Sequence, residues 1–154
     1  MLEYIKGKLV EGSPAHAVVE TNGIGYFLNI SLHSFSLLSG KSDVLLYVHE
    51  NIREDVHALY GFFDKAEREL FRHLISVSGV GANTARMMLS SMSPAELNTA
   101  IVTGNLNVLK SVKGIGLKTA QRLLVELKDK LAKEPHGAVF LPGLDNTARE
   151  EALS

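Results

Sequence analysis

Residues 74–89 read LISVSGVGANTARMML, and residues 109–124 read LKSVKGIGLKTAQRLL. Aligned at an offset of 35 residues, the two stretches agree at several positions, eight of which define a shared motif. The aligned pairs are Leu74 and Leu109, Val77 and Val112, Gly79 and Gly114, Val80 and Ile115, Gly81 and Gly116, Thr84 and Thr119, Ala85 and Ala120, and Leu89 and Leu124. Gly-apolar-Gly followed by alanine at this spacing is typical of the helix-hairpin-helix motif, and its recurrence predicts two such units in tandem.

The residue types of this motif suit a backbone that binds phosphate. Glycines permit a positive φ and let an anion come close to the main chain. The second helix of each unit presents unpaired N–H groups at its N-terminus, where the helix dipole also favours an anion. Such contacts position a DNA duplex without reading its sequence. The candidate phosphate-binding residues are Gly79, Val80, Gly81, Asn83, Thr84, Arg86, Lys113, Gly114, Ile115, Gly116, Lys118, Thr119 and Arg122.

The N-terminal 63 residues predict a small β-barrel. Polar residues alternate with β-branched and aromatic ones in five segments, residues 4–10, 15–21, 24–30, 44–51 and 56–62. Asn22 and Gly23 stand between the second and third segments and favour a tight hairpin, because both tolerate a positive φ. Residues 32–38 predict a short helical turn or a loop. Five short strands favour a barrel of the oligonucleotide-binding (OB) kind, with a meander or open sheet as the alternative.

From Asp64, the predicted N-cap, the hydrophobic period becomes helical. Ser93 and Glu96 form a predicted capping box that starts a helix, which ends before Gly104, and residues 117–131 predict a long amphipathic helix. We therefore expect an α+β chain with an OB-like barrel domain at residues 1–63 and an all-α tandem hairpin domain at residues 64–133. The composition of residues 134–145 predicts a flexible linker. We expect residues 146–154 to be the truncated start of a third domain.

The net charge of −1 hides an uneven distribution. Residues 1–63 hold four bases and seven acids, residues 64–133 eleven bases and six acids, and residues 134–154 one base and four acids. A basic middle segment between acidic ends favours an anionic partner for that segment, although a solvated helical surface has the same composition.

Composition and motifs argue against several other classes of protein. A chain with 45% hydrophobic and 21% charged residues is not disordered or collagen-like, and the absence of cysteine excludes disulfides and Fe–S clusters. The apolar runs are too short to cross a bilayer, so we expect a cytoplasmic protein with no membrane contact.

There is no Walker A loop and the histidines lack metal-ligand spacing, so we expect no catalytic residue, metal or cofactor. A base-excision glycosylase would use Lys118 as its nucleophile, but it needs a downstream carboxylate, for which the candidate aspartates are Asp129, inside the long predicted helix, and Asp145.

Arg53-Glu54-Asp55, followed by Leu59-Tyr60-Gly61-Phe62, completes a pattern that resembles the RuvA family of Holliday-junction-binding proteins over essentially the whole chain. The resemblance implies a non-catalytic subunit of a branch-migration helicase, active in recombination, DNA repair and the SOS response. It implies four-way junction DNA as the ligand and assembly of this chain into a homotetramer or octamer. A third domain would bind the hexameric ATPase RuvB, which uses the ATP, and the junction resolvase RuvC would be a further partner.

Glu54 and Asp55 are predicted at the solvated tip of the hairpin between the fourth and fifth strands, where an ordinary polar turn is the plain interpretation. The resemblance implies that four such acidic pairs surround the centre of the junction. Their charge would repel phosphates and so favour an open junction over a duplex. Ala82-Asn83 and Leu117-Lys118 provide fewer lysines than the family pattern leads us to expect, so we also expect weaker dependence on salt.

Two other interpretations stay open. A general helix-hairpin-helix module attached to a nuclease or polymerase would bind duplex DNA as a monomer. A pair of hairpins that serves protein contacts would not bind DNA at all.

Overall fold

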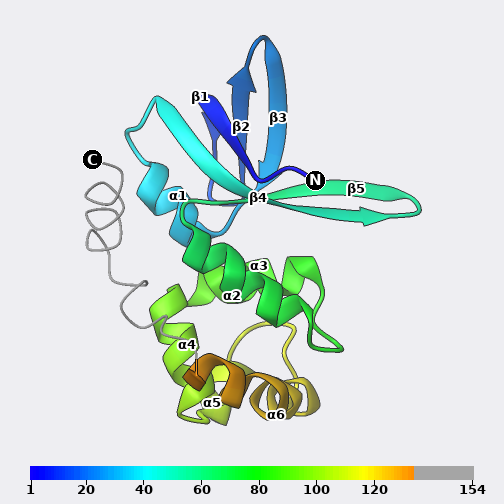
Figure 1. The fold of residues 1–154 in the computed structure, drawn as a ribbon. Coiled ribbons are helices and arrows are strands. Elements are labelled where there is room, and N and C mark those ends of the chain that lie inside the picture. Colours follow the sequence, from blue (N-terminus) through cyan, green and yellow to red (C-terminus); the bar gives the residue numbers. More distant parts are fainter. Residues whose placement is uncertain (134–154) are drawn as a thin grey trace.

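The structure is a computed structural model that describes residues 1–133. Its first part is a closed barrel with the strand order β1-β2-β3-β5-β4 (Figure 1). The strands are β1 (Tyr4–Gly12), β2 (His16–Thr21), β3 (Ile24–Asn29), β4 (Asp43–Arg53) and β5 (Val56–Phe62). A helix, α1 (Leu32–Leu38), connects β3 to β4. The predicted OB-like barrel is confirmed, and so is the β2–β3 turn, where Asn22 has φ 52° and Gly23 has φ 80°.

The outer part of the β4–β5 hairpin leaves the barrel. β1 pairs with β4 only between Asp43 and Tyr47, and β3 pairs with β5 at Tyr60. β4 and β5 nevertheless pair with each other as far as Arg53 and Val56. Residues 50–59, which we call the arm, therefore project from the body of the molecule (Figure 1).

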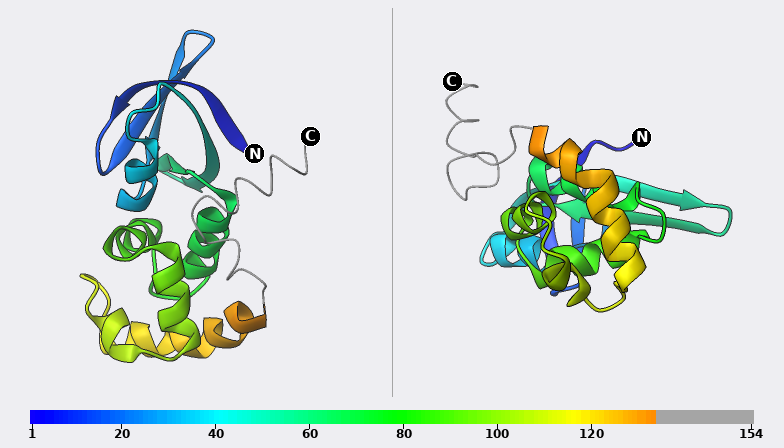
Figure 2. Two further views of the ribbon diagram at one scale, coloured as in Figure 1. Left: turned by 90° about the vertical axis from the view of Figure 1, so that its left-hand side faces the viewer. Right: turned by 90° about the horizontal axis from the view of Figure 1, so that it is seen from below.

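The second part is helical and lies on one side of the barrel, with α6 farthest from it (Figure 2). It consists of α2 (Lys65–Ile75), α3 (Ala82–Ser91), α4 (Pro94–Val102), α5 (Leu106–Lys110) and α6 (Leu117–Lys133). The predicted caps are confirmed: Asp64 accepts a hydrogen bond from the Glu67 N–H at 2.8 Å, and Ser93 and Glu96 form the capping box.

The two parts share the end of β5. Tyr60 and Phe62 belong to the hydrophobic core of the helical part, where both rings pack on Phe71 with ring centroids 5.3 and 4.9 Å away. Secondary structure changes after residue 62, but side-chain packing continues across that point. Because β5 contributes both to the arm and to the core of the helical part, this packing sets the angle of the arm relative to the helices.

A buried polar cluster joins α1 to α2. The Glu67 carboxyl is fully buried and accepts hydrogen bonds from Ser31 Oγ and from Ser34 Oγ, the latter at 2.5 Å. Ser34 Oγ also accepts the Phe63 N–H at 2.9 Å. Burial raises the pKa of Glu67 to about 8 against the opposing effect of the two serines, so the carboxyl is mostly protonated at neutral pH.

Candidate nucleic-acid interface

The two hairpins of the sequence repeat are also repeated in three dimensions. The N–H groups of Val80 and Ile115 each donate to the carbonyl three residues earlier, both at 3.1 Å. Those of Ala85 and Ala120 donate to the carbonyl four residues earlier, at 2.9 and 3.0 Å. All four side chains are buried, as the motif predicts. The repeat is thus a repeated backbone geometry as well as a similarity of residue types.

The two glycines of each hairpin have different roles. Gly79 and Gly114 have φ of 96° and 93°, in the left-handed region that side chains disfavour, so the turn itself requires them. Gly81 has φ −85°, and neither it nor Gly116 is among the residues with positive φ. A Cβ added to Gly81 or Gly116 would meet no atom within 4 Å. Neither strain nor packing explains these second glycines, and the absence of a side chain leaves the backbone here open to a ligand.

The helices that follow these glycines begin without a side-chain cap. Gly81 is the N-cap of α3 and makes no side-chain hydrogen bond, and Gly116 stands in the same place before α6. By contrast, side chains cap α1, α2, α4 and α5, supplied by Ser31, Asp64, Ser93 and Asn105. The first N–H groups of α3 and α6 are therefore left for solvent or an anion.

The two hairpins lie beside each other. A Cβ at Gly79 of the first hairpin would lie 3.4 Å from Thr119 Oγ1 of the second. If both turns bind phosphate as the sequence predicts, their adjacent positions suit the backbone of one DNA duplex.

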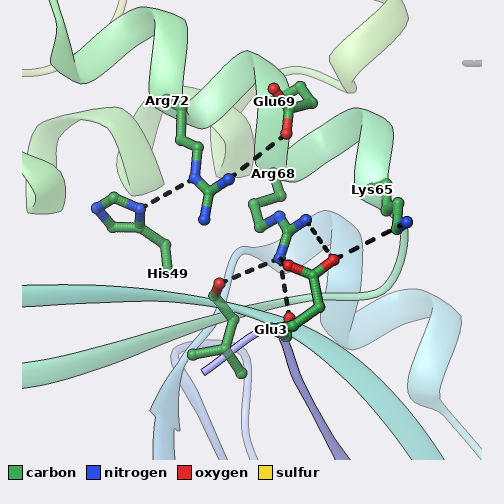
Figure 3. Close-up of polar contacts among 7 residues, drawn as sticks. Glu3, His49, Lys65, Arg68, Glu69 and Arg72 are labelled. Atoms are coloured by element: carbon green, nitrogen blue, oxygen red, sulfur yellow. Dashed lines mark hydrogen bonds and ion pairs between the residues drawn. The ribbon is translucent and has the colours of Figure 1, made fainter. Parts of the chain in front are cut away.

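Two groups of basic residues in the helical part differ in their surroundings. Those of α2 are used inside the molecule: Arg68 is buried against Glu3 at 3.0 Å, and Arg72 Nε donates to His49 Nδ1 at 3.2 Å (Figure 3). Burial, followed by the charges of Arg72 and Arg68, lowers the pKa of His49, so its neutral ring accepts this bond.

The bases of the second hairpin unit form the other group. Lys113, Lys118 and Arg122 are exposed, and in the described part of the chain they make no ion pair. The surplus of bases counted from the sequence therefore includes residues that only join the two parts, whereas these three are available to a ligand.

Arg86 is half-buried and hydrogen-bonded within the protein. Its Nε and Nη2 donate to Asn83 Oδ1 at 3.2 and 3.0 Å, and its Nη1 donates to the Ile30 carbonyl at 3.3 Å. Arg86 thus attaches α3 to the end of β3 and orients Asn83. It contributes positive charge near the first hairpin without being a free side chain.

Glu54 and Asp55 are exposed in the turn between β4 and β5, at the tip of the arm (Figure 1). This is the position predicted from the sequence. The molecule therefore carries donor-rich hairpins on its helical part and an acidic tip on the projecting arm.

Comparison with known proteins covers both parts of the chain. The family described as "RuvA N terminal domain" matches residues 1–61, and the family described as "SAM-like Helix-hairpin-helix tandem" matches residues 71–129. A Bacteroides fragilis protein named "Holliday junction branch migration complex subunit RuvA" is 56% identical over 162 residues, which cover 100% of this chain and 81% of that protein. The chain belongs to the RuvA family. Proteins of the same name from Christiangramia forsetii and Flavobacterium psychrophilum are 52% and 49% identical, each over 100% of this chain and 80% of the relative.

Membership of the RuvA family confirms the resemblance found in the sequence and the order of barrel and tandem hairpins. The roles of the predicted phosphate-binding residues and of the acidic pair stay predictions. The predicted linker and third domain lie outside the described residues of this RuvA-family chain. Within residues 1–133, no helix is both long and apolar enough to span a bilayer, and no three His, Asp or Glu side chains are grouped to hold a metal ion.

Proposed function

We propose that this chain binds four-way junction DNA through its phosphates, without sequence preference, and keeps the junction open for branch migration in recombination and repair. The observation that carries the proposal is the combination of two adjacent, uncapped hairpin turns with an acid-tipped arm whose strand β5 packs into the core of the helical part. The name of its relatives, a subunit of a Holliday junction branch migration complex, supports the same function.

The hairpin turns and the acidic tip of the arm have different roles in junction binding. The hairpin amides and the free bases Lys113, Lys118 and Arg122 hold phosphates of one arm of the junction. Glu54 and Asp55 repel phosphates at the crossover, which keeps the strands from closing over the centre. Repulsion lowers affinity for any DNA, so it is useful only where shape must be discriminated.

Four copies of the chain would match the four arms of a junction. A duplex engages one subunit, whereas a junction engages four at once and gains from the high effective concentration of the remaining sites. We therefore propose a homotetramer, or two tetramers as an octamer. RuvB would be the partner that hydrolyses ATP and RuvC a further partner, with this chain acting in the cytoplasm without metal or cofactor.

A gel-shift competition tests this proposal. A labelled four-way junction is bound at moderate salt and competed with unlabelled junction or with linear duplex of the same arm sequences, and the mass of the complex is measured. We expect strong preference for the junction in a complex of four or eight chains. Equal affinity for both DNAs by a monomer would reduce the function to that of a general duplex-binding module, and no binding at low salt would favour protein contacts.

A further inference from the structure

A hollow of about 260 Å³ lies between one side of the arm and the first hairpin. The arm and the end of β5 contribute Asn51, Arg53 and Tyr60, and the hairpin contributes the segment from Gly81 to Thr84. A group bound in this hollow would touch both parts of the molecule at once. No carboxylate is among the residues that line it.

The guanidinium groups of Arg53 and Arg86 place positive charge near this hollow. Arg53 is exposed and makes no side-chain hydrogen bond or ion pair within residues 1–133. Burial raises the pKa of the Tyr60 hydroxyl, and the charges of Arg86 and Arg53 oppose that rise, so both charges lie close to this hydroxyl. Arg86 is held by Asn83 and Ile30, so within residues 1–133 Arg53 is the cation of the hollow that has no protein partner.

The remaining polar groups of the hollow are mostly donors. Because Asn83 Oδ1 accepts two bonds from Arg86, its amide NH₂ is the group left to donate to a ligand. The uncapped N-terminus of α3 adds main-chain N–H groups, and Thr84 adds a hydroxyl. Several donors and positive charge around one small hollow suit an anion with several oxygens, such as a phosphodiester.

We infer that Arg53 is a DNA-binding residue that joins the first hairpin in holding one backbone phosphate between the arm and the start of α3. The inference rests on the proposed function and adds a site on the barrel part to the two hairpins. Arg53 directly precedes Glu54 and Asp55. One strand residue spans only about 3.3 Å, so an attractive charge is placed next to the repulsive pair. The phosphate backbone is thus anchored immediately before the point at which it is repelled.

The test is Arg53→Gln in the full chain, with Lys41→Gln as the matched control. Lys41 is exposed at the opposite end of β4, so the control removes the same charge from the same part of the molecule. We expect Arg53→Gln to weaken junction binding by about tenfold for each subunit that engages the junction, which is the loss of one charged hydrogen bond per subunit. The magnitude of the slope of log K against log salt should fall by about one for each of these subunits. Lys41→Gln should change neither quantity appreciably, and Arg53→Lys should retain most of the salt slope.

Single methylphosphonate substitutions along the junction strands then locate the contact. For the wild type, one neutral phosphate near the crossover should weaken binding, and for Arg53→Gln the same substitution should have little further effect. If Arg53→Gln binds as Lys41→Gln does while the wild type still prefers the junction, the inference is wrong and the proposed function stands. If the wild type shows no preference for the junction, the proposed function itself fails.

Discussion

The carboxylate of Glu3 meets the guanidinium of Arg68 in a two-point ion pair, with both N–O distances 3.0 Å (Figure 3). Arg68 is buried and also donates to the main-chain carbonyls of Glu3 at 2.9 Å and Val48 at 3.3 Å. One side chain of α2 therefore holds the chain before β1 and the middle of β4 together. Removing its carboxylate partner would leave a buried, poorly compensated charge, which is strongly unfavourable.

Glu3→Gln should lower the thermal unfolding temperature at pH 7. The hydrogen bond from Arg68, opposed by desolvation, holds the pKa of Glu3 below its ordinary value. A lowered pKa in the folded state means that the stabilisation is present above the ordinary pKa and is lost as the pH falls through the lowered one. The difference between wild type and variant should therefore shrink as the pH is lowered below the ordinary pKa of a glutamate. Glu20→Gln, an exposed carboxylate on β2, is the control, and an equal effect of both changes would contradict the role of the pair.

Glu67→Gln should change the pH dependence of stability in the opposite direction. Burial raises the pKa of Glu67 to about 8, so between its ordinary pKa and pH 8 the unfolded chain has released a proton that the folded chain retains. Stability of the wild type should fall as the pH rises through this range, by on the order of 1 kcal/mol per pH unit. Glutamine resembles the protonated carboxyl and does not titrate. Urea unfolding at pH 5.5, 7 and 8.5 should give a flatter profile for the variant, and parallel profiles would show that Glu67 is not the group responsible.

The structural roles of Glu3 and Glu67 could not be predicted from the sequence. The strands, the turn at Asn22 and Gly23 and the helix caps depend on neighbours within a few residues, and all were predictable. Glu67 stands three residues after the N-cap Asp64, where an acid ordinarily supports capping at the surface. Its burial depends on Ser31 and Ser34, which are 36 and 33 residues away.

The candidate site, too, could be predicted only where it depends on neighbouring residues in the sequence. Spacing alone predicted both hairpins, because each turn is local. It could not separate the bases of α2, which face the barrel, from those of the second hairpin unit, which remain free. Nor could it place Arg53 and Gly81 around the same hollow, because that arrangement depends on the angle between arm and helices.

Serine substitutions should separate the two glycines of the first hairpin. Gly81 has φ −85° and ψ 172°, close to the φ −87° and ψ 163° of the N-cap Ser31. Gly81→Ser should therefore cap α3, raise the free energy of unfolding by a few tenths of a kcal/mol, and still weaken DNA binding because the side chain occupies the exposed amides. Gly79→Ser should instead destabilise the protein by about 1–2 kcal/mol, because φ there is 96°. Chemical unfolding and junction titration measure both effects, and undiminished DNA binding by Gly81→Ser would remove these amides from the interface.

Lys118→Ala with Arg122→Ala should weaken binding to every DNA and flatten its salt dependence. Both residues are exposed near the start of α6 and are free of ion pairs within the described part. Each lost phosphate contact lowers the salt slope by about 0.9. Lys130→Ala is the control, since at 1.5 Å per residue it lies about 18 Å along the helix from Lys118. Titrations of junction and duplex at several salt concentrations give the slopes, and wild-type slopes in the double variant would exclude the second hairpin from phosphate binding.

Glu54→Gln with Asp55→Asn should raise affinity for linear duplex and reduce selectivity for the junction. Both side chains are exposed at the tip of the arm, so their removal should leave the fold intact. Repulsion between close charges in water is worth about 1 kcal/mol per pair, which predicts a several-fold gain in duplex binding. Glu20→Gln with Asp43→Asn removes the same charge from other exposed sites of the barrel and controls for net charge. A gain shared by both double variants would reflect net charge alone, and a loss of junction binding in the tip variant would mean that the acids bind the junction instead of repelling its phosphates.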